Sequence, residues 1–353
     1  MNRILDVEYP IVNCYPSTSN ALAILQTHSE MEGWIYCNFI QLFNTDEYTI
    51  DYFDFDAYNC PFINYGEIDY NVISCYSSYK EFICKMIDNG YYVSAYVEKS
   101  MVNLYQSDSG LHQLFIFGYD LGKNIYYCAD HFASGKYSFE ACDMEEVLAA
   151  ISSIKDKKYI NKAKGERFIE DYFCFQFYRY DFLRHRIKIK FLSEKKDEII
   201  ERIKKSLSDY LNGNKTENWC TRMDDMGHEE TLQHKWGIQV YDILIKHLDY
   251  LLESEHGSPF GRQSFFVMHN HKKVMKLRLI YLREKCLFDA GEKLFTMLDG
   301  LIEDTYSVCM SYIKCCYLKR EKRYLYLMKL YTYVRQNKEK EYIFFSELLK
   351  QLS

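Results

Sequence analysis

The hydrophobic pattern of the chain changes after Ser193, and this change most constrains its fold. Before that point, short runs of aromatic and β-branched residues alternate with turns, as in "HQLFIFGYD" at 112–120 and "NIYYCADHF" at 124–132. After it, "SEKKDEIIERIKKSLSDYLNG" and most of the remaining chain carry apolar residues at helical spacing. The pattern predicts an α+β N-terminal part, residues 1–192, followed by an all-α C-terminal part, residues 193–353.

Local signals predict individual elements in the N-terminal part. Pro16 lies near the first turn of a helix expected over 15–28, where a proline is favoured because the N–H that it lacks has no helical partner there. A second helix is expected from Ser77 to a stop at Asn89–Gly90. The pattern also predicts a strand at 91–98, two strands joined by a hairpin turn at 121–124, and a helix at 143–154.

Composition limits the class of protein. The 353 residues include 34 Tyr and 23 Phe, and 48% of the chain is hydrophobic, which is ample for a packed core. A net charge of −6 provides no overall basic field for nucleic acid. No apolar run approaches the ~18–20 residues of a membrane span. The 13 cysteines form no CxxC pair and are odd in number, so we expect reduced thiols in a cytoplasmic protein.

Three residues have the order and the setting of a cysteine-based catalytic triad. Cys14 stands just before a helix start, where the helix dipole favours a thiolate. His112 begins one strand and Asp130 ends the next, so a hairpin would bring their side chains to the same sheet edge. A carboxylate in that position orients the imidazole, which in turn activates the thiol. We predict Cys14 as the nucleophile, His112 as base and then acid, and Asp130 as the orienting residue.

Neighbouring residues have simpler explanations. Asp120 is expected to serve the turn of the hairpin, and His131 is expected to be an exposed neighbour of Asp130. Free cysteines are among the most buried residue types. A structural role therefore applies to the thiols outside the triad, including Cys37, Cys60, Cys75, Cys84, Cys128 and those of the C-terminal part.

The segment "HQLFIFGYDLGKNIYYCADHF" resembles the His–strand–"GYD"-turn–strand–Asp segment of papain-like cysteine peptidases of the bacteriocin-processing type. A Cys ahead of a helix matches the same plan. The whole layout, including "WGIQVYDILIKHL" and "MHNHKKVMKLRLIYL" in the helical part, is similar to the butirosin-biosynthesis acyltransferase family. A related cysteine protease homologue forms amide bonds in closthioamide-type assembly, and that precedent applies equally to this chain.

The resemblance implies a papain-like fold for the N-terminal part and an acyltransferase activity. The acyl group would come from the phosphopantetheine thioester of a carrier protein, pass to Cys14 as a thioester, and be captured by an amine. The protein would need no cofactor of its own, because the phosphopantetheine is carried by the partner. Such a reaction belongs to the biosynthesis of specialised, peptide-like metabolites.

The oxyanion hole departs from the pattern of the resembled families. Papain-like peptidases usually carry a Gln a few residues before the Cys, but no Gln occurs between Met1 and Cys14. Asn13 is the candidate donor, together with the backbone N–H of Cys14, because an ionised Glu8 has no proton to donate.

No metal site is predicted from the histidine patterns. His269 and His271 are two residues apart and therefore do not share a helix face. His228 and His234 are six apart and lack the i, i+4 spacing of a zincin helix.

Two further stretches each have two interpretations. "KREKRYLYLMKLYTYVRQNKEKE" is favoured as a solvated helix face with aromatic core contacts, and its alternative is a docking surface for an acidic carrier-protein helix. The docking residues would be Lys319, Arg320, Lys322 and Arg323. The aromatic stretch 48–70 would line an apolar acyl tunnel or simply pack in the core.

The sequence therefore predicts an amide-forming, cysteine-dependent acyltransferase that acts with a carrier protein, without a nucleic-acid or membrane partner. Two alternatives lie within the same fold: a peptidase or thioesterase that uses water, and a non-catalytic binding protein, which the absence of an upstream Gln favours. A Tyr-rich helical adaptor is a third possibility.

Overall fold

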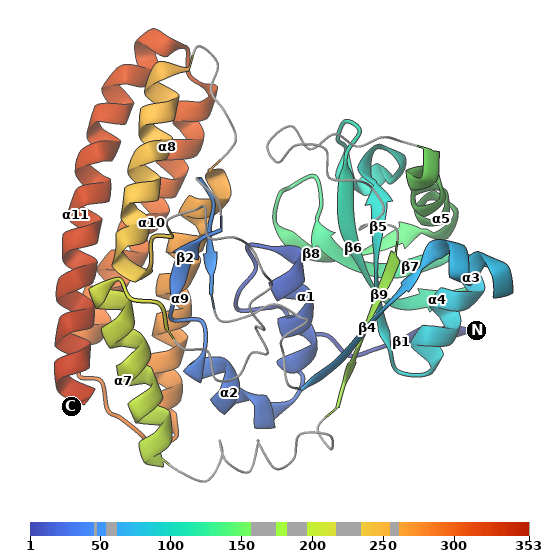
Figure 1. Ribbon diagram of the computed structural model, residues 1–353, viewed down its shortest axis with the longest axis horizontal. Coiled ribbons are helices and arrows are strands. Elements are labelled where there is room, and N and C mark those ends of the chain that lie inside the picture. Colours follow the sequence, from blue (N-terminus) through green and yellow to red (C-terminus); the bar gives the residue numbers. More distant parts are fainter. Residues whose placement is uncertain are drawn as a thin grey trace. The chain divides into compact units, whose positions relative to one another are not determined.

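The chain divides into two units in the computed structural model (Figure 1). The first unit comprises Met1–Ser29 and Asp56–His185, and the second comprises Glu30–Phe55 and Arg186–Ser353. The return to the second unit at Arg186 lies close to the predicted boundary after residue 192. The structure describes residues 1–45, 48–53, 62–156, 174–181, 196–216, 234–254 and 261–352.

The observed division differs from the predicted one in the segment Glu30–Phe55. The sequence pattern assigns this segment to the N-terminal part, whereas it belongs to the second unit. Arg278, whose side chain is completely buried, gives the physical reason. Its guanidinium donates hydrogen bonds to three backbone carbonyls of the segment, those of Tyr36, Asn38 and Phe39. Because a buried guanidinium needs such acceptors, the segment is fixed to the helix that carries Arg278.

The first unit is built on an antiparallel sheet with the strand order β4-β9-β5-β6-β7-β8. A short strand, β1, pairs with the second half of β6, beyond the part that pairs with β5. Aromatic and β-branched residues dominate these strands, as is typical of a buried sheet. The strands are β1 Asn2–Ile4, β4 Ile63–Asp69, β5 Tyr92–Glu98, β6 Leu111–Asp120, β7 Ile125–His131, β8 Tyr137–Asp143 and β9 Cys174–Tyr180.

Helices cover both faces of this sheet (Figure 1). α1 contacts β6, β7 and β9, and it is buried from Thr18 to Leu25 because all its residues except Asn20, which accepts a hydrogen bond from Tyr137, are apolar or small. α4 and α5 contact β5 from the opposite face, together with α3, which packs on α4. The helices are α1 Pro16–Leu25, α3 Tyr70–Tyr76, α4 Tyr79–Asp88 and α5 Met144–Ser152.

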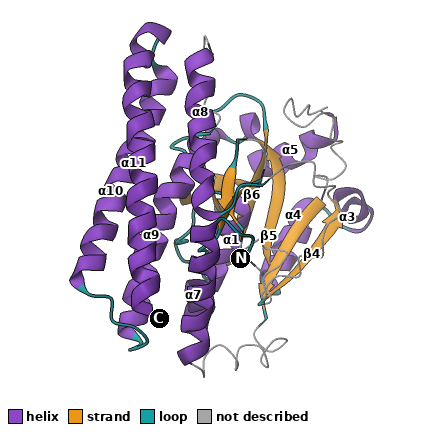
Figure 2. Ribbon diagram, turned by 60° about the vertical axis from the view of Figure 1, so that its left-hand side comes forward, coloured by secondary structure: helices purple, strands orange, loops and turns teal. Residues whose placement is uncertain are grey.

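The described residues of the second unit are helical apart from one short hairpin and the loops between elements. Figure 2 shows its long helices running alongside one another, and α10 packs against both α9 and α11. The elements are α2 Glu32–Cys37, β2 Leu42–Asn44, β3 Ile50–Tyr52, α7 Lys196–Asn212, α8 Tyr241–Glu253, α9 Arg262–Glu284, α10 Glu292–Tyr317 and α11 Arg320–Leu352.

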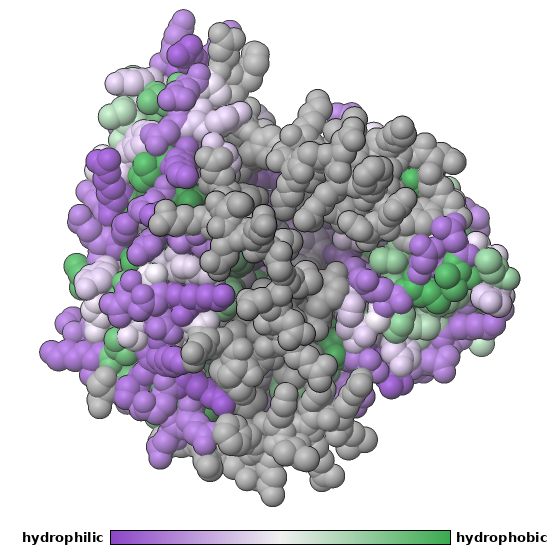
Figure 3. Space-filling model, viewed as in Figure 1, coloured by the Kyte–Doolittle hydropathy of each residue, from purple (hydrophilic) through white to green (hydrophobic). Residues whose placement is uncertain are grey.

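The mixed α+β class and the helical C-terminal part are confirmed, while the papain-like fold stays a prediction. None of the helices within the described residues combines the length and the apolar character that a membrane crossing requires. On the face shown in Figure 3, the helical unit is largely hydrophilic, and hydrophobic side chains gather over α3, where Val72 is exposed.

A buried ion pair joins two long helices of the second unit. The ammonium of Lys272 in α9 lies 2.6 Å from the Glu341 carboxylate in α11, and neither side chain is exposed. Tyr210 and Tyr241 donate their hydroxyl protons to the two oxygens of that carboxylate. His271 contacts Lys272 through Nδ1 and the Ile40 carbonyl through Nε2. Burial holds the pKa of His271 well below its usual value, so this ring is neutral and accepts from Lys272.

We expect Lys272→Met to destabilise the protein by about 3–5 kcal/mol, because it leaves the Glu341 carboxylate buried without its cation. Lys273→Met is the matched control: it is the same change at the next, exposed residue of α9, and it should alter the free energy of unfolding by less than ~0.5 kcal/mol. Urea unfolding followed by circular dichroism measures both. Equal effects of the two substitutions would contradict the structural role of the pair.

Candidate active site

The first unit brings His112 and Asp130 together at the open end of the β6–β7 hairpin, opposite its turn. Phe115 pairs with Ala129 across the two strands. Because His112 and Asp130 each lie an odd number of residues from that pair, both side chains project from the same face of the sheet. The His112 Nδ1 atom lies 2.6 Å from Asp130 Oδ2. The sequence therefore predicts this proximity correctly, and the catalytic roles of the two residues stay predictions.

Asp130 is a fully buried carboxylate with several donors. Besides His112, its Oδ2 accepts the hydroxyl proton of Tyr105, and its Oδ1 accepts the backbone N–H of His131 at 2.6 Å. Burial alone would raise the pKa of Asp130, but the hydrogen bonds from His112, His131 and Tyr105 outweigh it, so the pKa is lowered. The carboxylate is consequently ionised at neutral pH and can orient an imidazole.

Tyr105 is a member of this cluster that the sequence analysis missed. It ends the short 3-10 helix Asn103–Tyr105, and its ring packs against His112 and Phe132 with centroid distances of 5.6 and 5.1 Å. Burial raises the pKa of its hydroxyl well above the ordinary value, so the hydroxyl keeps its proton and acts as a donor. As one tyrosine among 34, it carries no local signal that distinguishes it in the sequence.

Glu98 fixes the loop that leads into His112. Its side chain is fully buried at the end of β5, and its carboxylate accepts the Gly110 N–H at 2.8 Å and the Ser109 hydroxyl at 2.9 Å. The same carboxylate accepts the N–H and the hydroxyl of Ser100. These bonds hold both ends of the segment 99–110, so the start of β6 and the 3-10 turn that carries Tyr105 are both anchored.

Cys14 is buried, with 7% of the residue exposed, and it lies two residues before α1. Tyr15 is extended, with φ of −132°, and Pro16 occupies the first turn, as the sequence predicts. The carbonyl of Asn13 lies 2.7 Å from His131 Nε2. A short series of contacts thus connects the residue before Cys14, through His131, to Asp130 and His112.

His131 was expected to be exposed, and the structure corrects this. Only 17% of its side chain is exposed, because the ring lies between the Asn13 carbonyl and the ring of Tyr137. Since a carbonyl oxygen only accepts, Nε2 of His131 carries a proton and donates it to Asn13. His131 therefore ties the segment that carries Cys14 to the end of β7.

The side chain of the candidate oxyanion donor Asn13 contacts Tyr9. Its Nδ2 donates to the hydroxyl of Tyr9 at 3.2 Å. An amide nitrogen has two protons, so this bond leaves one for another acceptor. The role of Asn13 in an oxyanion hole stays a prediction.

Arg323 is wrongly assigned to the docking surface by the sequence analysis. Only 2% of it is exposed, and its guanidinium donates to the carbonyls of Leu251 and Ser254 at the end of α8 and of Leu318 at the end of α10. The side chain thus satisfies carbonyls that have no partner within their own helices. The other three docking residues, Lys319, Arg320 and Lys322, are exposed.

Several thiols outside the triad have environments that suppress reactivity. Burial raises the pKa of Cys37, Cys84, Cys174 and Cys315 to about 11, and that of Cys309 to about 12. A thiol with such a pKa is protonated at neutral pH and is a poor nucleophile. Cys60, predicted to be structural, lies outside the described residues.

Three of the histidines considered for a metal site lie within the described residues, and their contacts are those of packing. His271 belongs to the buried network of the second unit, and burial lowers the pKa of His269 to about 4. His234 contacts the Asn44 carbonyl at 2.7 Å, while His228 lies outside the described residues. Within the described part of the chain, no three His, Cys, Asp or Glu side chains converge as metal ligands would.

The aromatic stretch 48–70 is divided between the two units, and its residues 54–61 lie outside the described ones. Tyr52, Phe62 and Tyr70 are each at most 3% exposed. Their burial agrees with core packing, and the role of the stretch as an acyl tunnel stays a prediction.

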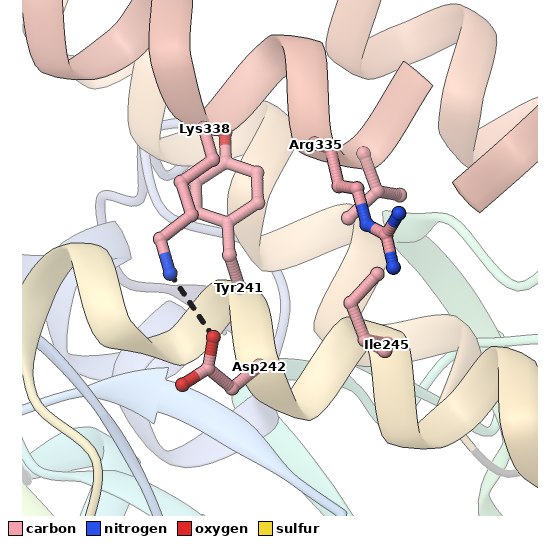
Figure 4. Close-up of a pocket in the computed structure, with 6 residues that line it drawn as sticks. Tyr241, Asp242, Ile245, Arg335 and Lys338 are labelled. Carbon is pink, nitrogen blue, oxygen red and sulfur yellow. Dashed lines mark hydrogen bonds and ion pairs between the residues drawn. The ribbon is translucent and has the colours of Figure 1, made fainter. Parts of the chain in front are cut away.

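A pocket of about 330 Å³ lies between α8 and α11 of the second unit (Figure 4). Its charged side chains include Lys338 and Asp242, which form an ion pair of 3.0 Å, and Arg335. The lining has no thiol and no imidazole, so it offers no group for nucleophilic catalysis. The cluster around Asp130 is the better candidate for an active site.

A comparison of the chain with known protein families and with curated proteins finds no match.

The lowered pKa of Asp130 predicts a specific pH dependence of stability. The ionised carboxylate contributes stability above the pKa of an unfolded Asp, about 3.9, and this contribution disappears as the pH falls through the lower pKa of the folded state. The difference in free energy of unfolding between wild type and Asp130→Asn should therefore shrink between pH 5 and pH 2. Urea unfolding at several pH values measures it, and a constant difference would contradict the ionised state of Asp130.

Proposed function

We propose that the protein is a cysteine-dependent acyltransferase with a papain-like catalytic part. In this proposal Cys14 is the nucleophile, His112 is the acid and base, and Asp130 orients His112. The observation that supports it is the contact of the His112 ring with a buried, ionised carboxylate, at the hairpin end to which His131 ties the segment of Cys14. Such a pair is what a thiol needs for activation.

The first half-reaction transfers the acyl group to the protein. Because Nδ1 of His112 is bound to Asp130, Nε2 is the nitrogen that takes the proton of the Cys14 thiol. The thiolate attacks the carbonyl carbon of a thioester, and a new C–S bond forms. The negative oxygen that develops is stabilised by the Cys14 N–H and the Asn13 side chain. The bond to the old sulfur breaks, and the departing thiolate takes the proton from His112.

The second half-reaction releases the product. An amine attacks the acyl-Cys14 thioester, and His112 accepts a proton from the amine nitrogen. The bond between the acyl carbon and the Cys14 sulfur breaks, which yields an amide, and the thiolate recovers the proton from His112. Use of water as the acceptor would make the same site a thioesterase or a peptidase, so transfer requires that the amine be held near the thioester.

The thioester is proposed to arrive on the phosphopantetheine of a carrier protein, and the protein itself then needs no cofactor. Carrier proteins are acidic and helical, and they would complement the exposed cations at the start of α11. Lys319, Arg320 and Lys322 are exposed beside the apolar side chains of Tyr317 and Leu325, which are 79% and 68% exposed. Exposed apolar groups within a cationic rim suit a protein partner. A cytoplasmic location belongs to the same proposal.

The nucleophile is tested with S-acyl-N-acetylcysteamine, a thioester that represents the end of a phosphopantetheine arm. We expect intact-mass spectrometry to show one acyl increment on the wild type and none on Cys14→Ala. Cys84→Ala is the control, and it should acquire the increment like the wild type. Asp130→Asn should slow acylation by roughly 10²–10⁴-fold, because the imidazole loses its orienting anion.

An amine added to the acylated protein decides between transfer and hydrolysis. Formation of the amide with little free acid supports the acyltransferase. Equal release of free acid with and without any amine of a panel would reject transfer. Absence of an acyl increment on the wild type, with iodoacetamide labelling Cys14 no faster in the folded protein than in urea, would reject the nucleophile itself.

If the proposed docking surface is correct, charge reversal there should affect the reaction with an acyl-loaded carrier protein but not the reaction with the small acyl donor S-acyl-N-acetylcysteamine. Charge reversal to Glu at Lys319, Arg320 and Lys322 should raise KM for an acyl-loaded carrier protein about tenfold or more and leave the rate with S-acyl-N-acetylcysteamine unchanged. The same reversal at the exposed residues Lys80, Lys85 and Lys123 is the matched control and should change neither. An equal response of KM in the two triple variants would remove the docking surface from the proposal.

A further inference from the structure

We propose that Tyr105 is a positioning residue that weakens the hydrogen bond between Asp130 and His112. His112 can then release its proton and act as a base in the second half-reaction. The inference rests on the proposed function for its catalytic consequence. The contacts that carry it belong to the first unit alone.

Tyr105 and His112 share one oxygen atom. The Tyr105 hydroxyl and the His112 ring nitrogen both bind Oδ2 of Asp130, while Oδ1 receives the His131 N–H. An ionised carboxylate only accepts, so the hydroxyl must be the donor. Tyr105 is 4% exposed and Asp130 is not exposed, so water does not substitute for this hydroxyl easily.

Donors that share an acceptor compete for its negative charge. Part of the charge on Oδ2 is neutralised by the Tyr105 hydroxyl, and the bond from His112 is weaker than it would be alone. In a buried site such effects are larger than in water, because the local dielectric constant is low. Removal of the hydroxyl makes the carboxylate a stronger acceptor for the Nδ1 proton of His112 and favours the charged imidazolium.

Other titratable groups near Asp130 do not take over this role. From β7 and β8, Cys128, Cys142 and Tyr137 approach the cluster, and burial raises the pKa of Cys128 and Tyr137 well above their ordinary values. Cys128 and Tyr137 are therefore neutral at working pH. The ring of His131 lies 3.7 Å from the other oxygen, Oδ1, and its Nε2 donates to the Asn13 carbonyl. Among the described residues, Tyr105 is thus the neutral donor that is bound to the same oxygen as His112.

The strength of the hydrogen bond between Asp130 and His112 matters for the step in which the amine attacks. A general base works only in its unprotonated form, and it is most effective when its protonation lies near the working pH. If Asp130 bound His112 more tightly, a larger share of the acylated protein would carry an imidazolium, which cannot accept a proton from the amine. By weakening that bond, Tyr105 keeps a larger share of the acylated protein with a neutral His112 ring that can act as a base.

The test is Tyr105→Phe, which removes the hydroxyl and keeps the ring that packs on His112 and Phe132. Tyr137→Phe is the matched control, because it removes another buried hydroxyl of this unit, bound to Asn20 at 2.8 Å rather than to Asp130. Circular dichroism and urea unfolding verify that both variants fold.

The first readout is independent of catalysis. With ¹⁵N-labelled histidine, the ring-nitrogen resonances of His112 are followed against pH, and their protonation midpoint should move upward by roughly 0.5 pH unit in Tyr105→Phe. It should stay in place in Tyr137→Phe. An unchanged or lowered midpoint in Tyr105→Phe, or an equal rise in both variants, overturns the inference.

The second readout is the pH profile of amide formation from the acylated protein. Its acid limb should move to higher pH by a similar amount in Tyr105→Phe, with the plateau rate retained within about threefold. A loss of rate at every pH without a displacement of the limb indicates a merely structural role and overturns the inference. If the wild type forms no acyl adduct, the proposed function fails, and the resonance titration still decides whether Tyr105 tunes His112.

Discussion

The first unit depends on a negative charge that is completely removed from water at Asp130. An ionised carboxylate in such a place is strongly unfavourable unless donors surround it. Three different segments supply the donors here: the start of β6 with His112, the end of β7 with His131, and the 3-10 turn that ends at Tyr105. The fold must therefore bring these segments together before the charge is tolerated, and the geometry of a potential catalytic pair results from that requirement.

The second unit satisfies the same constraint with cations. Lys272 is neutralised by Glu341, and Arg278 and Arg323 are surrounded by backbone carbonyls. Each of these contacts joins segments that are distant in the sequence. Arg278 fixes the segment Glu30–Phe55 to α9, and Arg323 donates hydrogen bonds to carbonyls at the ends of α8 and α10. Hydrophobic helix faces explain why this unit is a packed set of helices. The buried charges determine which of its segments contact one another.

Sequence reasoning succeeded where the signal is local. The strand pattern around 112–132 and its turn predict the hairpin, and the hairpin alone brings His112 to Asp130. Tyr105, Glu98 and the ring of His131 were missed because their roles depend on partners that the local pattern does not reveal. Arg323 was assigned to the surface for the same reason: its charge is visible in the sequence, but the carbonyls that surround it come from the ends of two other helices.

Glu98 and Asp130 position different parts of His112. Glu98, at the end of β5, holds the loop that enters β6, and Asp130, at the end of β7, holds the ring itself. The loop between Glu98 and His112 also carries Tyr105 back to Asp130, so backbone and ring are fixed by one closed set of contacts. The thiol of Cys14 comes from outside this set, and the bond between His131 and the Asn13 carbonyl is one contact that ties its segment to the hairpin. In the proposed triad, an imidazole held this firmly serves the nucleophile only if the segment of Cys14 is also held in place, and the bond from His131 to Asn13 contributes to that.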